Sequence, residues 1–441
     1  MRIFVYKVLT IMYIIVALFT IGCAKGEYEQ GDLDNPSITV IESNDVEIAF
    51  PDHFKETFDD GYDVKVHIAA DVNASANNTI ITVAAQQRAL SVGDVINVLC
   101  RCIGKRNYSF ISDWTFSKNF YQNKLDGLEP YKKIVPKTVI QFLQESYQDA
   151  PIDERKTVFQ IEDSQSKSIN SIYIEYENSF EPGILSYIVN GDFHFAFQRS
   201  LFEEVFTEQT VEEYRNDPAY NEAYLERIKP GIPSLSETDA IQYAQELLKD
   251  VNADLTLYKS EACSIISNYV VEKSTGWTLT FTKNVNGLQE RHEREWSYTN
   301  PDYPPKNVAP YVNEYIQITI DGSGVCSFIW QGACDLLEES IKEAALFNTE
   351  LLPQSIADTL QHLYKDHKNA SGKGLLFEIT EIDLGAALIR ITETKEDRFI
   401  PVWYIYYLER WQDSTENIGK GMLIFNAIDG SYIEPRVISA E

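Results

Sequence analysis

Alternating apolar and polar positions predict strands and hairpins along most of the chain. A first hairpin is predicted over residues 185–197, where Asn190 and Gly191 accept the positive φ angles that a tight turn requires. A second is predicted over residues 314–330, where isoleucines alternate with polar residues, so that one strand face is buried. Further strands are predicted at residues 64–72, 79–85, 172–177, 277–281, 376–382, 386–392, 399–407 and 422–428.

Apolar residues spaced three and four apart predict helices between these strands. Ser236 precedes one of them, over residues 237–251, with Asp239 three positions on, as in a capping box. Residues 201–206 also fit one helical face, and residues 336–345 fit a connecting helix. Pro353 begins another helix, which extends to Leu363.

The order of these elements predicts an α+β fold of several modules, with antiparallel sheets each covered by helices. The break at residues 229–233 marks a domain boundary. Two repeated units, each with a helix first and a sheet after it, are expected in the C-terminal half. The predicted divisions are 1–22 (signal peptide), 23–45 (flexible tether), 46–230 (N-terminal α+β domain), 231–345 (first module) and 346–441 (second module).

Composition changes this picture mainly through charge. The 441 residues are 44% hydrophobic and 24% charged, which is ordinary for a folded protein, but the formal net charge is −29. Such a charge repels phosphate backbones, so no nucleic-acid partner is expected. It also keeps the protein as a whole away from anionic lipid headgroups, and acyl chains would provide the attachment to a membrane.

The first residues indicate export and lipid attachment. Arg2 and Lys7 precede residues 8–22, an uncharged run that is short for a membrane-spanning helix and suits a signal peptide. The sequence Thr20-Ile21-Gly22-Cys23 resembles a bacterial lipobox, in which the cysteine is acylated and becomes the mature N-terminus. We therefore expect lipidation of Cys23 and a location on the extracellular face of the cell membrane. An uncleaved membrane anchor is the alternative, and it also places the chain outside the cytoplasm.

Five cysteines follow Cys23, and an odd number argues against a complete disulfide framework. Cys326 and Cys334 leave one pairing open. Cys100 and Cys102 are too close for a relaxed bridge and are expected to be small buried residues.

Several strand motifs resemble a known group of proteins. They are similar to an uncharacterised lipoprotein family of Gram-positive bacteria, a "domain of unknown function" group, whose halves resemble PepSY-type modules. This resemblance implies secretion, lipid attachment and α+β modules, and it implies no established activity and no catalytic residues. The motifs are residues 276–281, 315–322 and 325–330 in the first module, and 382–385, 400–403 and 425–430 in the second.

Motifs for catalysis or metal binding are weak, so neither a metal site nor a cofactor is predicted. His292 begins HExE rather than the zinc motif HExxH. Asp71 and Asn73 begin a sequence like a calcium loop, but glycine is missing from its sixth position and glutamate from its twelfth. Residues 164–167 match SxxK without its companion motifs.

Aromatic residues give the one candidate contact surface. The long connection between strands at residues 284–313 is of a length that is often functional. Its aromatic rings could stack on a sugar or hold a peptide, and the alternative is a loop packed against its own domain. The residues are Trp296, Tyr298, Tyr303 and Tyr311. Trp277, Trp330 and Trp403 are instead expected in the core.

These observations favour a cell-surface lipoprotein that binds a peptide, a protein or an envelope component without catalysis. The alternatives are an exported hydrolase that acts on cell wall or polysaccharide through unmarked acidic residues, and a structural spacer. The partner and the oligomeric state stay open.

Overall fold

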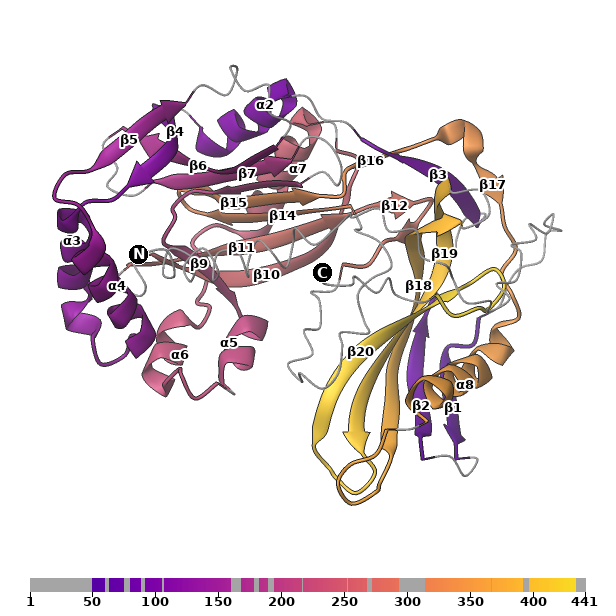
Figure 1. Ribbon diagram of the computed structural model, residues 1–441. Helices are drawn as coiled ribbons and strands as arrows, with labels where there is room; N and C mark the ends of the chain where they lie inside the picture. The colour runs from indigo at the N-terminus through magenta and orange to yellow at the C-terminus, as the bar shows by residue number, and fades with distance from the viewer. Residues whose placement is uncertain are drawn as a thin grey trace. The chain divides into compact units, whose positions relative to one another are not determined.

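The fold is described by a computed structural model, in which antiparallel sheets combine with seven α-helices among the described residues (Figure 1). Within those residues, each helix is too short or too polar to cross a lipid bilayer. The described residues are 50–59, 63–74, 80–88, 92–104, 107–159, 168–177, 182–188, 194–215, 217–251, 253–267, 272–292, 314–365, 367–391 and 396–433.

The chain divides into two compact units that are interleaved in sequence. Among the described residues, unit 1 comprises 87–282 and 314–333, and unit 2 comprises 50–86, 283–292 and 334–433. This division differs from the predicted boundaries at 230/231 and 345/346. It differs because strands from both sides of residue 230 share one sheet.

Unit 1 is built on a ten-stranded sheet in which each neighbouring pair is antiparallel. The pairings β7–β8 and β14–β15 confirm the two predicted hairpins. In spatial order the strands are β5 (Arg155–Phe159), β4 (Tyr108–Thr115), β6 (Ser168–Tyr176), β7 (Gly183–Ile188), β8 (His194–Gln198), β15 (Gly324–Gln331), β14 (Tyr315–Asp321), β11 (Glu272–Thr282), β10 (Thr256–Ser267) and β9 (Glu203–Thr207).

Two helices, α2 (Val92–Ile103) and α7 (Glu237–Asp250), cover one face of this sheet (Figure 1). The predicted cap of α7 is confirmed, since Ser236 Oγ accepts a hydrogen bond from the Asp239 amide at 3.1 Å. The α7 residues at the predicted spacing point into the core beside Leu279 and Ile318. Burying these apolar surfaces together is what holds the helix on the sheet.

Four more helices and a 3-10 turn flank the sheet and share a second core. Leu128, Leu143, Leu225 and Ile228 are buried together there with Ile266 of β10. The elements are α3 (Lys118–Leu128), η1 (Glu129–Tyr131), α4 (Lys137–Asp149), α5 (Glu208–Arg215) and α6 (Glu222–Ile228).

Unit 2 contains an eight-stranded sheet and a short separate hairpin. Strand β2 runs parallel to β18, so the sheet is mixed, and the prediction of purely antiparallel sheets is wrong at this point. The path of the sheet is β1 (His53–Phe58), β2 (Lys65–Asn73), β18 (Leu375–Ile391), β19 (Glu396–Trp411), β3 (Ile81–Gln87) and β16 (Cys334–Leu336), with β20 (Asn417–Asn426) beside β19 and β17 (Lys342–Glu343) beside β3. The hairpin is β12 (Asn284–Val285) with β13 (Leu288–Gln289).

Helix α8 (Leu352–Tyr364), preceded by η5 (Thr349–Leu351), packs on the sheet of unit 2. Its Ile356 and Leu360 are fully buried, as the predicted periodicity requires. Trp403 is also fully buried in this core, and Trp330 is fully buried in unit 1, so both are core residues as predicted. Trp277 is half-buried against the core of unit 1.

Three predicted elements are wrong. Residues 203–207 form strand β9 rather than a helix, because this segment pairs with β10 at the sheet edge. Residues 336–345 form β16, the 3-10 turn η4 (Glu338–Ser340) and β17 rather than a helix. The strands predicted at 376–382 and 386–392 are one strand, β18, which pairs along its length with β19. In each case a tertiary partner overrides the local pattern.

Candidate functional site

The candidate site is a cavity in unit 1, of about 340 Å³, between the last turn of α2, helix α7 and the sheet. Six of its ten lining residues are apolar or aromatic, and polar atoms share the exposed wall with them. The lining residues are Cys102, Ile103, Gly104, Tyr176, Phe197, Arg199, Tyr243, Ser323, Gly324 and Val325.

Two glycines shape the rim of the cavity. Gly104 ends α2 with a φ of 71°, and its amide donates to the Cys100 carbonyl at 3.0 Å. Gly324 has a φ of 117° in the turn between β14 and β15. Both backbone conformations suit glycine, because a Cβ atom disfavours positive φ angles. The rim is therefore fixed by local backbone geometry.

Three aromatic rings line the cavity. Tyr176 and Phe197 are buried, whereas 39% of Tyr243 is exposed. A Cβ atom on Gly183 would lie 2.6 Å from Tyr176 Oη, so the absence of a side chain there leaves room for this tyrosine. Tyr243 is the ring that an incoming ligand can reach.

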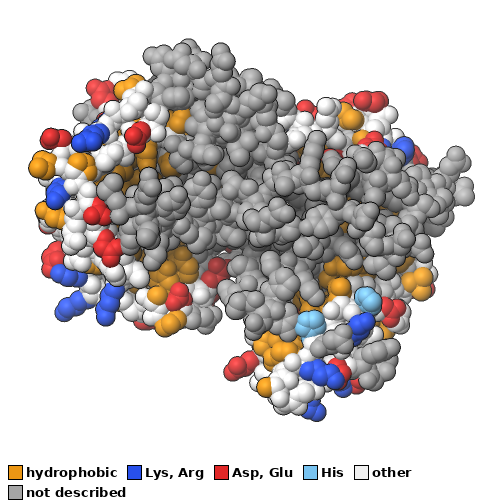
Figure 2. Space-filling view, viewed as in Figure 1, with side chains coloured by type: hydrophobic (Ala, Val, Ile, Leu, Met, Phe, Trp, Pro, Cys, Tyr) orange, Lys and Arg blue, Asp and Glu red, His pale blue; other side chains and the backbone are white. Residues whose placement is uncertain are grey.

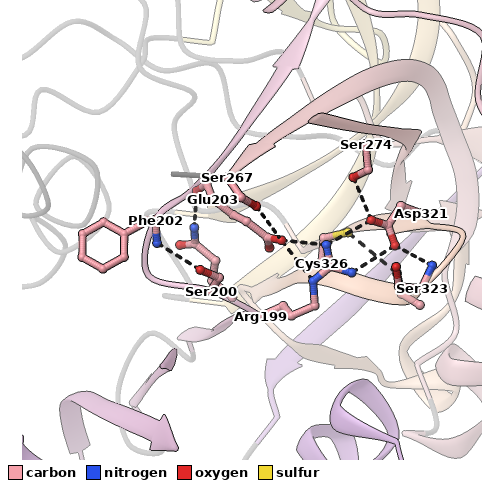
Figure 3. Close-up of polar contacts among 11 residues, drawn as sticks. Arg199, Ser200, Phe202, Glu203, Ser267, Ser274, Asp321, Ser323 and Cys326 are labelled. Atoms are coloured by element: carbon pink, nitrogen blue, oxygen red, sulfur yellow. Dashed lines mark hydrogen bonds and ion pairs between the residues drawn. The ribbon is translucent and has the colours of Figure 1, made fainter. Parts of the chain in front are cut away.

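Arg199 lines the cavity and forms ion pairs with the carboxylates of Asp321 and Glu203 (Figure 3). It forms two parallel hydrogen bonds with Asp321, each 3.0 Å long, and its Nη2 lies 2.7 Å from Glu203 Oε1. The side chains of Glu203 and Asp321 are almost fully buried. The positive charge of the guanidinium is thus balanced by two buried carboxylates.

Three serines complete this network in Figure 3. Ser274 Oγ donates to Asp321 Oδ2 at 2.9 Å, and the Ser323 amide donates to Oδ1 at 2.8 Å. Ser267 Oγ donates to Glu203 Oε1 at 3.3 Å. Glu203 Oε2 is buried and makes no hydrogen bond with a described residue. Asp321 therefore accepts hydrogen bonds at both carboxylate oxygens, whereas those accepted by Glu203 all reach Oε1.

The pKa values of the two carboxylates move in opposite directions. Burial raises the pKa of Glu203, and Arg199 offsets only part of that effect. Burial would also raise the pKa of Asp321, but the hydrogen bonds and charge of Arg199 hold it below its usual range. For Arg199 burial alone would lower the pKa, and its bonds to both carboxylates raise it instead.

The buried thiols near this network are poor nucleophiles. Burial raises the pKa of Cys263 to about 11, and it also raises the pKa of Cys326 and Cys102 far above the ordinary thiol value. Because the thiolate is the reactive form, these cysteines stay protonated and inert at neutral pH. The arrangement can bind an apolar group, and the groups beside it do not form an activated nucleophile.

A second polar cluster lies in unit 2. Asn73 Nδ2 donates to Glu381 Oε1 at 2.9 Å and to Asp383 Oδ1 at 2.8 Å, and Arg291 pairs with Asp383 at 2.9 Å. Asp71 and Asn73 lie in strand β2, opposite Glu381 and Asp383 of β18, and not in a calcium loop. Across the described part of the chain, no three His, Cys, Asp or Glu residues are placed to hold a metal ion.

Several predicted site residues cannot be placed. Cys23 and the aromatic residues Trp296, Tyr298, Tyr303 and Tyr311 lie outside the described residues, as does the SxxK motif at 164–167. They stay predictions.

The five later cysteines are all free thiols, so the open pairing of Cys326 with Cys334 is not formed. Cys102 is buried as predicted. Cys100 is exposed, and the prediction that it is buried is wrong. It lies on the solvent side of α2, with its Sγ 3.2 Å from Tyr108 Oη.

No motif in the sequence indicates the cavity or its arginine. Arg199 follows the aromatic strand β8, and its partner Asp321 is 122 residues away. Arg199 belongs to no motif, and the motif at 315–322 that contains Asp321 assigns that residue no role, so no local signal joins the two residues. The one available hint was Asp321 at the start of the predicted turn of the second hairpin.

Comparison with known protein families finds none that matches, and comparison with curated proteins finds no matching relative. Among solved structures, the chain is similar to an uncharacterised protein from Eubacterium rectale ATCC 33656. The TM-score is 0.45 at 12% identity, over 88% of this chain and 94% of the other. A similarity of this size assigns neither a fold family nor an activity, so the function is argued from the site itself.

Proposed function

We propose that this chain is a lipid-anchored surface protein that binds a peptide, protein or envelope component without catalysis. The observation that carries the proposal is the cavity of unit 1, which has an aromatic wall and an arginine already neutralised by two carboxylates. Cavities that combine aromatic and aliphatic side chains with a few oriented polar groups are typical of binding sites.

The size of the cavity limits what enters it. Its volume of about 340 Å³ is near the lower end of ligand pockets, which span roughly 300–1,000 Å³. One aromatic or branched side chain fits, whereas a polymer does not. We infer that a larger partner inserts a single apolar side chain beside Tyr243.

The anchor is proposed from the sequence around Cys23. The basic residues, the uncharged run and the small residue before Cys23 together support acylation and an extracellular location. Stable attachment needs two acyl chains, because one chain holds only marginally. In cells fed labelled fatty acid, Cys23→Ser should remove the label and release the protein from the membrane fraction. Label on this variant would disprove the site.

We also propose that the C-terminal half contains two PepSY-like repeats. The order of elements supports this, because α7 precedes the antiparallel strands β10, β11, β14 and β15, and α8 precedes β18, β19 and β20. Superposition of the backbone of these two sets of elements tests the proposal. Agreement of helix and strands in the same order and direction supports a repeat, and strands that pair in a different order contradict it.

We rank an exported hydrolase below a binding protein. Hydrolysis through acidic residues needs carboxylates that reach the substrate. The two carboxylates beside the cavity are instead bound by Arg199 and buried.

Binding at the cavity is tested with small probes on the chain from residue 24 onward, which contains each described helix and strand. The probes are the N-acetyl amides of phenylalanine, leucine and valine, with glutamine as the polar counterpart. Titration calorimetry should show saturable binding of the apolar probes and none of glutamine. Tyr243→Ala should weaken that binding about tenfold, since an aromatic contact contributes about 0.5–1.5 kcal/mol beyond its buried area.

The matched control is Ile152→Ala, which removes an exposed apolar side chain of unit 1 that does not line the cavity. Its affinity should equal that of the parent chain. Equal binding of glutamine, or binding unchanged by Tyr243→Ala, would show that the cavity is not the site.

A further inference from the structure

Five basic residues gather at one end of unit 1, although the chain as a whole carries a net charge of −29. They come from the connection between η1 and α4, the end of α6, and the start of β11. We call them the basic patch. Figure 2 shows Lys and Arg side chains over the part of unit 1 where α3 and α4 lie in Figure 1, with Asp and Glu side chains among them. The residues are Lys132, Lys133, Arg227, Lys229 and Lys273.

Specific contacts make this patch one surface. The Arg227 guanidinium lies 5.7 Å from the centre of the Tyr131 ring, which joins α6 to the segment that carries Lys132 and Lys133. Lys273 Nζ donates to the Lys229 carbonyl at 2.7 Å, which joins β11 to the end of α6.

The positive charge of the patch is only partly compensated. Lys132 pairs with Glu129 at 3.2 Å. Within the described ranges, Lys133, Lys229 and Lys273 form no ion pair with a carboxylate.

The like charges also act on one another. Burial and the neighbouring charge of Arg227 lower the pKa of Lys273, and Glu226 offsets part of this effect. An anion at this surface would therefore relieve repulsion that the folded chain already carries.

An exposed apolar side chain lies within the patch. Ile232 is 94% exposed, the largest exposed fraction among the large apolar residues described. Its carbonyl accepts a hydrogen bond from Thr275 Oγ1 at 3.1 Å, and Pro230 and Pro233 restrict the backbone on either side. The loop is thus pinned to β11 while Ile232 points away from the protein.

We propose that the basic patch docks unit 1 on an anionic lipid surface, with Ile232 entering the headgroup region. The combination of lysines and one apolar residue favours this partner, because a lipid interface offers both negative charge and an apolar layer. A soluble polyanion offers only the charge. The proposal rests on the lipid anchor of the proposed function, which would keep the patch near the membrane.

The overall acidity of the chain does not prevent this docking. Charges separated by more than about 8 Å are largely screened at physiological ionic strength. A lipid surface in contact with the patch therefore responds to its five basic residues, and to Glu129 and Glu226 beside them, rather than to the distant carboxylates. An acidic face that approaches the anionic lipid surface is repelled, so the protein is oriented with the basic patch toward the lipid.

Vesicle sedimentation of the chain from residue 24 onward tests the proposal without the anchor. Vesicles of 30% phosphatidylglycerol in phosphatidylcholine should bind it at low salt and release it at high salt, and pure phosphatidylcholine should not bind it. The double substitution Lys132→Gln with Lys133→Gln should lower the partition coefficient about 30-fold, which corresponds to about 1 kcal/mol for each lysine. Ile232→Ser should lower it severalfold and leave the salt dependence unchanged.

The matched control replaces two exposed lysines of unit 2, Lys55→Gln with Lys365→Gln, and should bind like the parent chain. Equal loss in this control would mean that net charge, and not the patch, drives binding. Polyglutamate and inorganic phosphate serve as competitors. Full competition by polyglutamate together with unchanged binding of Ile232→Ser would show a general polyanion site and overturn the lipid proposal.

The result of the vesicle experiment can be separated from the proposal that the cavity binds an apolar side chain. The patch variants keep the cavity, so their binding of the acetyl-amide probes should be unchanged. A failure of vesicle binding therefore leaves the cavity proposal standing, and a failure of probe binding leaves the patch standing.

Discussion

Arg199 and Asp321 form a bidentate ion pair, with Nη1 and Nη2 each 3.0 Å from one carboxylate oxygen, although 122 residues separate them. The pair joins the end of β8 to the end of β14, and Arg199 adds Glu203 at the start of β9. A planar guanidinium suits this geometry, because it presents donors in a fixed fork. The network thus fixes three segments of unit 1 beside the cavity.

Removal of the guanidinium should be strongly destabilising. Arg199→Met leaves two buried carboxylates without their partner, and we expect a loss of about 3–5 kcal/mol in the free energy of unfolding. Urea titration at pH 7 measures this loss. The control is Arg215→Met, which breaks an exposed pair with Glu212 and should cost less than about 1 kcal/mol. Similar losses for both variants would contradict the assigned role of Arg199.

The two carboxylates should give opposite pH dependences. The pKa of Asp321 is lowered in the folded chain, so its contribution to stability is present above about pH 3.9, the unfolded value, and is lost as the pH falls through the folded pKa. The stability deficit of Asp321→Asn relative to the parent chain should therefore be large at pH 7 and shrink below about pH 4.

For Glu203 the sign is reversed. Its folded pKa is raised, so its stabilising contribution is full below about pH 4.3, the unfolded value, and is lost as the pH rises through the folded pKa. Glu203→Gln should therefore become more stable relative to the parent chain as the pH rises. Urea titrations between pH 3 and 7 measure both differences, and parallel slopes for the two variants would refute this assignment.

Thiol labelling should distinguish one cysteine from the others. In the chain from residue 24 onward, Cys100 is exposed and the four other thiols are buried. A disulfide reagent at pH 8 should modify about one thiol rapidly, and the remainder only after unfolding. Cys100→Ser should abolish the rapid phase. Rapid modification that persists in this variant would show that a buried thiol is accessible.

Alanine substitutions at two glycines should change the free energy of unfolding in opposite directions. A Cβ atom on Gly276 would overlap the Ile320 carbonyl oxygen, and this backbone atom cannot move without disturbing the pairing of β11 with β14. We expect Gly276→Ala to cost at least about 1–3 kcal/mol. Gly127→Ala, in helix α3 with no atom near its added Cβ, should stabilise by about 0.5–1 kcal/mol. Thermal and urea unfolding measure both, and a stabilising Gly276→Ala would contradict the close approach.

The local sequence pattern predicted the structure correctly where the residues that interact lie close together in the chain. Ser236 and Asp239 are three residues apart, and the cap they predict is formed. The strands around residues 190 and 322 pair as predicted, because adjacent strands need only a suitable turn. Trp330 and Trp403 are buried as the flanking apolar residues indicate.

The local sequence pattern predicted the wrong structure where a segment pairs with a strand that is distant in the chain. Residues 201–206 have apolar spacing that suits a helix, but the edge of β10 offers backbone hydrogen bonds, and residues 203–207 form a strand. The parallel pairing of β2 with β18 joins residues more than 300 positions apart, and nothing in either strand predicts it.

The sequence by itself determined the mixed helix and strand composition, the two hairpins, the helix cap and the expectation of an exported acidic protein, because each depends on neighbouring residues or on composition. Only the tertiary structure decided the interleaved units, the cavity, the Arg199 network and the basic patch around Ile232. Each of these brings together residues that are far apart in the chain, and their contact depends on how the sheets are assembled rather than on any local preference.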